Sequence, residues 1–247
     1  NAATAGAFVL SESYLYTSEP IKDSLEHLGG NGILAAQFGE FDYDRKPNRT
    51  SRYVATARHA LGELGVRDPA SHILVATSPV EGGASLSTIL VKREPFTTAE
   101  VDRFLAALGT MPGGTLRYAP GHPVRGQSVS AIATLPGSRL DRWYDSYPYD
   151  VRPITDDSPF FWHFTPFRDV LADFGKPIDR SDFEVDVGER VLLLLLGIAT
   201  LFAAVFLLLP FVRIRSIWSA LPRKRRSPLY FSALGLGFMF FEITLIQ

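Results

Sequence analysis

The sequence contains no cysteine among its 247 residues. Disulfide bonds, thiolate metal sites and cysteine nucleophiles are therefore excluded, and the redox compartment stays undetermined. An excess of either charge is lacking too, because 25 Lys and Arg residues nearly balance 26 Asp and Glu residues, for a formal net charge of -1. Proteins that bind nucleic acid usually carry a basic patch or stripe, so we expect no nucleic acid partner.

A signal peptide and an initiator methionine are also missing. Residues 1–6 have neither a basic start nor a long apolar run, as a signal peptide would, and there is no initiator methionine. The chain ends at Gln247, inside an apolar stretch. We therefore expect both ends to be cuts through a longer protein.

Familiar catalytic motifs are absent as well. The sequence has no Gly-x-Ser-x-Gly elbow and no glycine-lysine loop of the Walker type. Asn48-Arg49-Thr50 fits a glycosylation sequon, a pattern that is common by chance. We expect no metal site, because no ligand spacing such as His-x-x-x-His relates the histidines, which are His27, His59, His72, His122 and His163.

What the sequence does have is a long apolar run. Residues 191–212 carry no charge, and about 20 apolar residues are enough for a helix to cross a hydrocarbon core. A buried core helix is the alternative, but such helices seldom run so long without a polar face. Residues 228–247 are long enough to be most of a second span. We therefore expect an integral membrane protein whose partner is a lipid bilayer, a bacterial plasma membrane.

The loop between the two runs is strongly basic. The positive-inside bias counts most near the membrane ends, so loop 213–226 is predicted to be cytoplasmic and the preceding soluble part to lie on the opposite face. Acidic residues outnumber basic ones just before the first run, which agrees with this orientation. The basic residues are Arg213, Arg215, Arg223, Lys224, Arg225 and Arg226.

Glu242 is the one ionisable residue deep in the second run. Such residues are costly in lipid and usually face a bundle interior or a polar pathway. One interpretation is a proton or substrate path. The favoured interpretation is a protonated carboxyl that is hydrogen-bonded to a neighbouring helix, and Gly235 and Gly237 would permit close packing of that helix.

Helical and strand patterns alternate over the first 110 or so residues. Apolar spacing predicts helices at 16–28, 49–64 and 97–108, and the last begins with a capping box of Thr97 and Glu100. Short apolar runs bounded by turn signals predict strands at 33–38, 72–77 and 85–92. The first strand is expected to be buried and parallel to its neighbours. The other two are expected to form an antiparallel hairpin.

This order predicts an α/β fold, namely the second half of a doubly wound sheet that ends in an antiparallel hairpin. Residues 109–137 are rich in Gly and Pro and are expected to be irregular. The aromatic stretch 143–167 is expected to pack against the α/β unit, and the membrane interface is the alternative. The expected organisation is a partial domain at 1–137, a juxtamembrane segment at 138–190 and a membrane region at 191–247.

Acidic residues supply the candidate binding groups. Glu40, Asp42 and Asp44 follow the first predicted strand, and ligands bind at the carboxyl ends of strands in open α/β sheets. A solvated acidic loop is the alternative for these three. Asp156 and Asp157 would suit a cation or an amine, although such a pair more often caps a turn or a helix.

Residues 11–41, SESYLYTSEPIKDSLEHLGGNGILAAQFGEF, resemble the segment of spermidine and spermine synthases that begins just after the catalytic aspartate. In that family a Leu-Tyr or Leu-Phe pair opens a helix that leads to a glycine-rich pattern and a glutamine on the fifth strand. The matching residues here are Leu15-Tyr16, Gly30, Gly32-Ile33-Leu34 and Gln37. Residues 149–164 (YDVRPITDDSPFFWHF) and 229–243 (LYFSALGLGFMFFEI) are similar to the C-terminal part of membrane-fused spermidine-synthase-like proteins.

The resemblance implies a Rossmann-like methyltransferase sheet that ends in an antiparallel hairpin. It also implies aminopropyl transfer from decarboxylated S-adenosylmethionine to a small amine, or a methyltransferase reaction with S-adenosylmethionine itself. Acids and aromatic side chains would hold the polycation. The cofactor loop and the catalytic aspartate belong upstream of Asn1, so this chain alone is expected to be inactive. The expected substrate-binding residues are Tyr14, Tyr16, Gln37, Glu40, Asp156 and Asp157.

Two functions therefore remain open. The first is a membrane-bound transferase similar to spermidine synthase. The second is a non-enzymatic or transport-linked membrane protein that uses a degenerate Rossmann domain to bind a ligand or a partner. A glycine-rich loop followed by an acid in the upstream sequence would favour the first.

Overall fold

The computed structural model describes residues 11–172, 174–176, 186–209 and 226–246. The chain divides into two compact units, Asn1–Leu192 and Leu193–Gln247. The first unit is an α/β domain that includes residues 138–166, and the described residues of the second form apolar helices.

The first unit follows the predicted order of helices and strands. It contains η1 (Tyr14–Tyr16), α2 (Ser18–His27), β1 (Ile33–Glu40), α3 (Asn48–Glu63), η2 (Pro69–His72), β2 (Ile73–Pro79), β3 (Ser85–Lys92), α4 (Thr98–Thr110), β4 (Thr115–Ala119), β5 (His122–Pro123), α5 (Ser128–Thr134), α6 (Gly137–Ser146) and α7 (Phe167–Ala172). The capping box predicted for α4 is confirmed, with reciprocal hydrogen bonds between Thr97 and Glu100. The prediction that 109–137 is irregular is wrong, because β4, β5 and α5 lie there.

The sheet has the strand order β1-β3-β2-β4-β5, and each neighbouring pair is antiparallel. The predicted hairpin of β2 and β3 is confirmed. The prediction of a buried, parallel first strand is wrong. β3 lies between β1 and β2, so these two strands run in the same direction without touching, and β1 alternates between exposed and covered residues. The polar side chain of Gln37 on the exposed face agrees with a half-covered strand.

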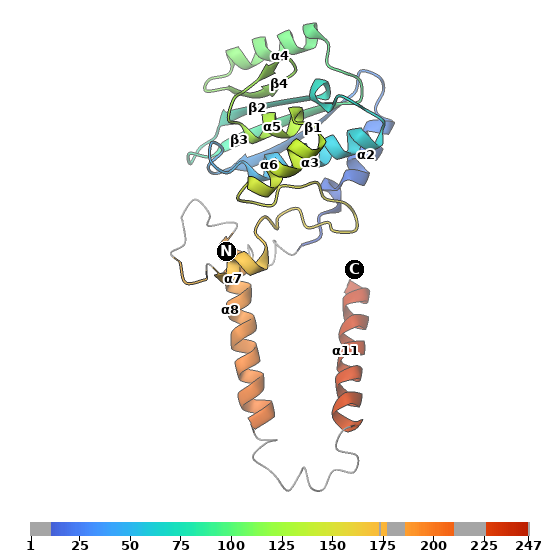
Figure 1. Ribbon diagram of the computed structural model, residues 1–247, viewed down its shortest axis with the longest axis vertical. Coiled ribbons are helices and arrows are strands. Elements are labelled where there is room, and N and C mark those ends of the chain that lie inside the picture. The colour runs from blue at the N-terminus through green and yellow to red at the C-terminus, as the bar shows by residue number, and fades with distance from the viewer. Residues whose placement is uncertain (1–10, 173, 177–185, 210–225, 247) are drawn as a thin grey trace. The chain divides into compact units, whose positions relative to one another are not determined.

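Helices cover the sheet unequally. Figure 1 shows α2, α3, α5 and α6 on one face and α4 on the other. The larger core lies under α3 and contains apolar residues of β1, β2, β3, α5 and α6. The smaller core joins α4 to β2 and β4 through Leu74, Phe96, Val101 and Ala119. Buried Lys92 of β3 holds the start of α4 by an ion pair with Glu100 at 2.8 Å.

The aromatic stretch 143–167 packs against the α/β unit, as predicted. Phe161 and Phe164 are fully buried in the larger core, and Trp143, Tyr147 and Trp162 pack at its border. Polar backbone accompanies these rings into the core, because residues 150–166 form no regular helix or strand. The carbonyl groups of this loop must therefore find donors elsewhere.

Arg52 of α3 supplies those donors. Its guanidinium donates hydrogen bonds to the carbonyl oxygens of Phe161 and His163 at 2.8 Å, of Phe160 at 3.1 Å and of Asp150. The Asp150 carboxylate lies 3.3 Å away, and the guanidinium stacks over the Phe164 ring. The Arg52 side chain is 1% exposed, and this burial lowers its pKa to about 10, although Asp150 opposes the shift.

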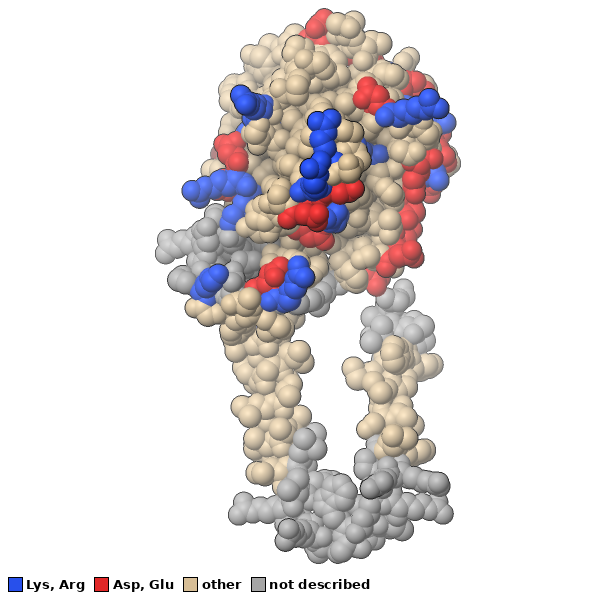
Figure 2. Space-filling model, viewed as in Figure 1, with Lys and Arg blue, Asp and Glu red and all other residues tan. Residues whose placement is uncertain are grey.

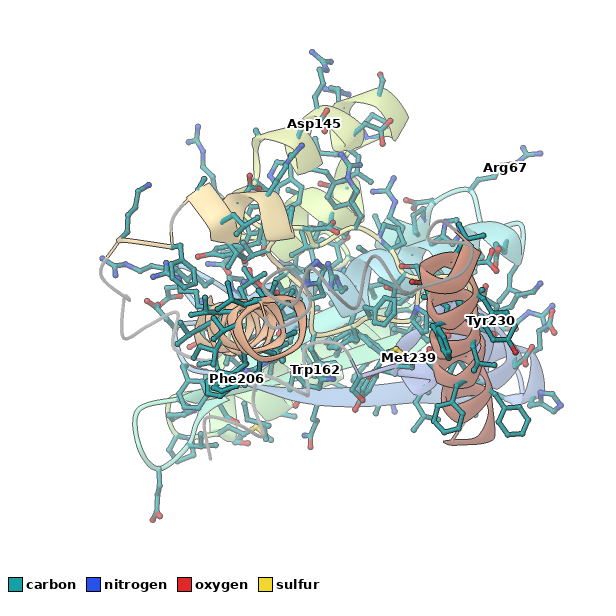
Figure 3. The ribbon with its side chains drawn as sticks, turned by 90° about the horizontal axis from the view of Figure 1, so that it is seen from below. Arg67, Asp145, Trp162, Phe206, Tyr230 and Met239 are labelled. Carbon is teal, nitrogen blue, oxygen red and sulfur yellow. The ribbon has the colours of Figure 1, made fainter. Side chains whose placement is uncertain are left out.

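Among the described residues, one helix is long and apolar enough to cross a membrane. It spans Gly188–Phe206, within α8 (Asp186–Ala203) and the π-helical turn η4 (Ala204–Leu208). The second predicted span is a helix, α11 (Arg226–Ile246), but its described apolar stretch, Leu229–Phe241, is shorter. Figure 2 shows both helices without charged side chains over most of their described length, and Figure 3 shows Phe206, Tyr230 and Met239 projecting from them. Most of the basic loop and the Glu242 side chain lie outside the described residues.

Replacing Arg52 by Ala should destabilise the first unit by about 3–5 kcal/mol, because several buried carbonyl groups would lose their donor. Arg52→Lys should recover only part of this loss, since an ammonium lacks the planar fork. Urea unfolding of the full chain, followed by tryptophan fluorescence, measures the change. Arg139→Ala on the exposed face of α6 is the matched control and should change stability by less than about 0.5 kcal/mol. An Arg52→Ala value as small as the control would contradict the role given to Arg52.

Candidate functional site

Aromatic rings gather where η1 meets the loop that precedes α7. The Tyr16 ring lies 4.6 Å from Phe161, 5.6 Å from Phe38 and 6.2 Å from Trp162, measured between ring centroids. Phe38 and Phe161 are buried, whereas Tyr16 and Trp162 are half-buried. The half-buried rings leave aromatic surface at the edge of the domain (Trp162 is labelled in Figure 3). We call these rings, together with Tyr14 and the nearby acids Glu12, Glu19 and Asp156, the aromatic–acidic cluster.

Carboxylates surround the same place. Thr17 donates a hydrogen bond to Asp156 at 2.6 Å, and the Asp156 backbone N–H donates to Glu19 at 3.1 Å. The Tyr14 hydroxyl donates to Glu12 at 3.0 Å. The structure thus brings the predicted residues Tyr14, Tyr16 and Asp156 together. Thr17 and Asp156 are 139 positions apart in the sequence.

The cluster is negatively charged. Glu19, Asp156 and Asp157 form no ion pair with any Lys or Arg in the described part of the chain. The hydrogen bond to Glu12 and the nearby charge of Asp156 raise the pKa of Tyr14 above its ordinary value. Figure 2 shows acidic side chains gathered on the side of the molecule where α2 lies. The guanidinium of Arg49 lies 5.4 Å from the centre of the Trp162 ring, so one ring of the cluster already holds a cation. Acids without a basic partner, beside half-buried rings, attract organic cations.

Two predicted residues lie apart from this cluster. Gln37 is on the opposite face of β1, where its amide donates a hydrogen bond to Thr88 at 3.1 Å. Glu40 is 3% exposed, and its carboxylate accepts hydrogen bonds from the Thr50 backbone N–H and hydroxyl at 2.8 and 2.9 Å. Glu40 therefore satisfies the start of α3, where the helix dipole favours an anion. Asp157, the neighbour of Asp156, is exposed.

Burial dominates the chemistry of Glu40. Desolvation raises the pKa of its carboxyl to about 7, although the hydrogen bonds from Thr50 and the charge of Arg49 oppose the shift. Thr50 also bonds Ser87 at 2.6 Å, so the core layer becomes polar where β1 ends. Glu40 has no access to solvent, and its bonds are those of a structural group.

A second polar group lies next to Glu40, at the carboxyl ends of β1 and β2. Arg117 of β4 donates hydrogen bonds to Thr77 at 2.8 Å and to Asp44 at 2.6 Å, and its guanidinium lies 4.2 Å from the centre of the Tyr43 ring. Asp44 also lines a cavity of about 600 Å³ between the β1–α3 loop, the β5–α5 loop, α5 and α6. Asp42 pairs loosely with Arg45 at 3.9 Å.

Sequence reasoning missed Arg52, Arg117 and the cavity. Small residues surround Arg52 on the helix, with Ser51, Ala55 and Thr56 in place of the charges that a solvent-facing arginine usually has beside it, and this pattern was the available signal. The sequon asparagine, Asn48, is 3% exposed at the first position of α3, so the folded chain does not present it for glycosylation. In the described residues no group of three or more His, Asp or Glu could hold a metal ion.

Glu40 should make stability depend on pH. Its carboxyl has an ordinary pKa of 4.5 and binds a proton more tightly in the folded chain. Its contribution to the free energy of unfolding is therefore complete below pH 4.5 and is lost as the pH rises through about 7. The loss amounts to about 3 kcal/mol. The free energy of unfolding, measured in urea near pH 5 and near pH 8, should differ between the two pH values by about that much less for Glu40→Gln than for the wild type. Asp157→Asn, in an exposed turn, should leave the wild-type pH dependence intact, and identical slopes for Glu40→Gln and the wild type would refute the assignment.

Comparison with known proteins adds no relative to these observations. No protein-family model, no curated protein and no solved structure matches the chain. The functional proposals below therefore rest on the chain's own residues and on the resemblance of residues 11–41, 149–164 and 229–243 to spermidine-synthase-like proteins.

Proposed function

We propose that this chain is the amine-binding, membrane-attached part of a spermidine-synthase-like transferase. The observation that carries the proposal is the aromatic–acidic cluster, in which Tyr14, Tyr16 and Trp162 lie beside Glu19 and Asp156. These residues come from the two segments that resemble the family. The resemblance places Tyr14 and Tyr16 near the substrate, and the acidic pair at Asp156 was an independent candidate for binding an amine. Their proximity supports the proposal.

The cluster suits a small polyamine physically. An ammonium group is attracted to the face of an aromatic ring, and a carboxylate a few ångströms away adds a Coulomb attraction that is modest in water and larger near a protein surface. A polyamine carries several ammonium groups separated by short apolar segments. Carboxylates beside rings match that alternation, whereas a simple inorganic cation would gain little from the rings.

The sheet topology is compatible with the proposal. β1 and β2 run in the same direction and the strand that follows them, β3, is antiparallel to both. The resemblance implies a sheet that ends in an antiparallel hairpin. Here β2 and β3 form such a hairpin, and β4 and β5 extend the sheet beyond β2. Helices on both faces of the sheet agree with the α/β class.

The residues of this chain are poorly suited to bind S-adenosylmethionine or its decarboxylated form. Dinucleotide and nucleoside cofactors are usually held by a glycine-rich loop between a strand and a helix, with an acid at the end of the next strand. In the described part of the chain, Gly29, Gly30 and Gly32 precede β1 instead of following a strand. We therefore assign S-adenosylmethionine and its decarboxylated form to no residue of this chain, and the proposal for these residues is confined to the amine.

A second candidate function is ligand binding without catalysis. It is favoured by Glu40, which is buried and held by Thr50 and is therefore no proton acceptor for a substrate. In this function the cluster would hold an amine for sensing or transport. The two candidates share the site and differ in whether an aminopropyl donor is consumed.

The chain should bind spermidine at the aromatic–acidic cluster. Isothermal titration of the full chain in nanodiscs of zwitterionic lipid, with empty nanodiscs as the blank, measures the affinity. Asp156→Asn and Glu19→Gln should each weaken binding about threefold to tenfold, because each removes about 1 kcal/mol of attraction. Binding should also weaken as salt is raised, since exposed charges are screened.

The matched control is Glu81→Gln, an exposed acid in the turn between β2 and β3, which should leave spermidine affinity unchanged. Equal affinity in the wild type and in the Asp156→Asn and Glu19→Gln variants would rule out this site. Incubation of the full-length parent with decarboxylated S-adenosylmethionine and spermidine separates the two functions, because only the transferase forms spermine.

A further inference from the structure

The cavity of about 600 Å³ has a wall composition opposite to that of the aromatic–acidic cluster. It is lined by Asp44, Arg45 and Pro47 of the β1–α3 loop, by the end of β5 and residues 124–127 of the β5–α5 loop, and by α5, Trp143 and Tyr147. Its volume lies within the range of sites for small molecules, about 300–1,000 Å³. The residues of the proposed amine site contribute nothing to it.

Positive charge dominates the rim. Arg45 comes from the first loop and Arg125 from the second, and both line the cavity. Arg125 makes no ion pair or hydrogen bond with any described residue through its side chain, and Arg45 has only the loose 3.9 Å pair with Asp42, with its side chain 74% exposed. Two arginines on separate loops provide planar donors that match a carboxylate or a phosphate.

The acid in the wall is already neutralised. Asp44 is the single carboxylate among the described residues that line the cavity, and Arg117 donates a hydrogen bond to it at 2.6 Å from the buried side. Arg117 itself is anchored to Thr77 and stacked on Tyr43. Asp44 therefore does not cancel the charge of Arg45 and Arg125, and an anion in the cavity would meet a net positive rim.

The opposite wall is aromatic. The rings of Trp143 and Tyr147 are stacked with their centroids 4.9 Å apart, and both are half-buried. The Tyr147 hydroxyl donates to Asn48 at 3.4 Å, and Ser128 beside it bonds Ser51 at 2.7 Å, so the polar groups at the base are held in place. Fixed aromatic rings present a flat apolar surface on which another ring can stack.

We infer that this cavity binds a small organic anion with a flat ring, such as an aromatic carboxylate, whose ring stacks on Trp143 and Tyr147 and whose anionic group meets Arg45 and Arg125. The inference does not rest on the proposed function, because the two sites share no residue and select opposite charges. A polyamine is repelled from this rim. The cavity thus gives the domain a second ligand site, for a ligand class that the spermidine-synthase resemblance does not include.

A pair of probes with one ring and opposite charges tests the inference. Indole-3-acetate carries a carboxylate and tryptamine carries an ammonium on the same indole. Saturation-transfer NMR on the full chain in nanodiscs, with empty nanodiscs as the blank, should show saturable binding of indole-3-acetate with a Kd of about 1 mM or tighter. Tryptamine should not compete with it.

Substitutions in the cavity test whether indole-3-acetate binds there. The double variant Arg45→Gln and Arg125→Gln should weaken indole-3-acetate binding about tenfold or more, because it removes the charge-assisted contacts. Trp143→Leu should weaken it as well, by loss of stacking. Arg139→Gln, on the exposed face of α6 outside the cavity, is the matched control and should bind like the wild type.

Three results would overturn the inference: no saturable binding of indole-3-acetate, equal binding of tryptamine, or an affinity unchanged in the double arginine variant. Failure of this test is distinct from failure of the amine site, since Asp156→Asn should leave indole-3-acetate binding intact. Likewise, the double arginine variant should bind spermidine as the wild type does.

Discussion

The guanidinium of Arg52 is the interaction on which the arrangement of this domain depends. A loop rich in aromatic rings can enter a core only if its backbone carbonyl groups are satisfied, and Arg52 satisfies those of Asp150, Phe160, Phe161 and His163 from the middle of α3. Burying the charge is costly, as the lowered pKa of Arg52 indicates. The cost is offset because one rigid group replaces several donors. With the loop fixed, Phe161 and Trp162 reach Tyr16, and the aromatic–acidic cluster is formed.

Both proposed ligand sites follow from a change of polarity along the sheet. The layer under α3 is apolar at Ile73, Val75 and Ile89 and becomes polar at Thr77, Ser87 and Glu40, where β1 and β2 end. Beyond this point the connecting loops carry charges of both signs. Acids face the start of α2, whereas arginines face α5 and α6. One α/β unit therefore offers two surfaces that select opposite charges.

Local sequence patterns predicted most of the helices and strands, because each depends on neighbours within one turn or one strand. The capping box at Thr97 and the hairpin of β2 and β3 are of this kind. The parallel first strand was wrong because strand order depends on β3 entering between β1 and β2, which no short pattern encodes. Among the predicted site residues, Tyr14, Tyr16 and Asp156 lie close together, whereas Glu40 is bound by a hydroxyl ten positions away and Gln37 lies on the other face. Arg52 was missed because its partners are about a hundred residues distant.

The hydrogen bond between Thr17 and Asp156 has a consequence for biosynthesis. These residues are 139 positions apart, so the first helix of the domain leaves the ribosome long before its partner exists. The segment that completes the domain is followed within some 30 residues by the apolar helix Gly188–Phe206. The domain therefore cannot complete its fold until the ribosome has nearly reached the apolar helix. Folding of the α/β unit and delivery of that helix to its apolar surroundings thus overlap in time. A chain truncated before Asp156 would lack Phe161 and Phe164, which belong to the same core as Ile21 and Leu25 of α2, and would leave that core incomplete.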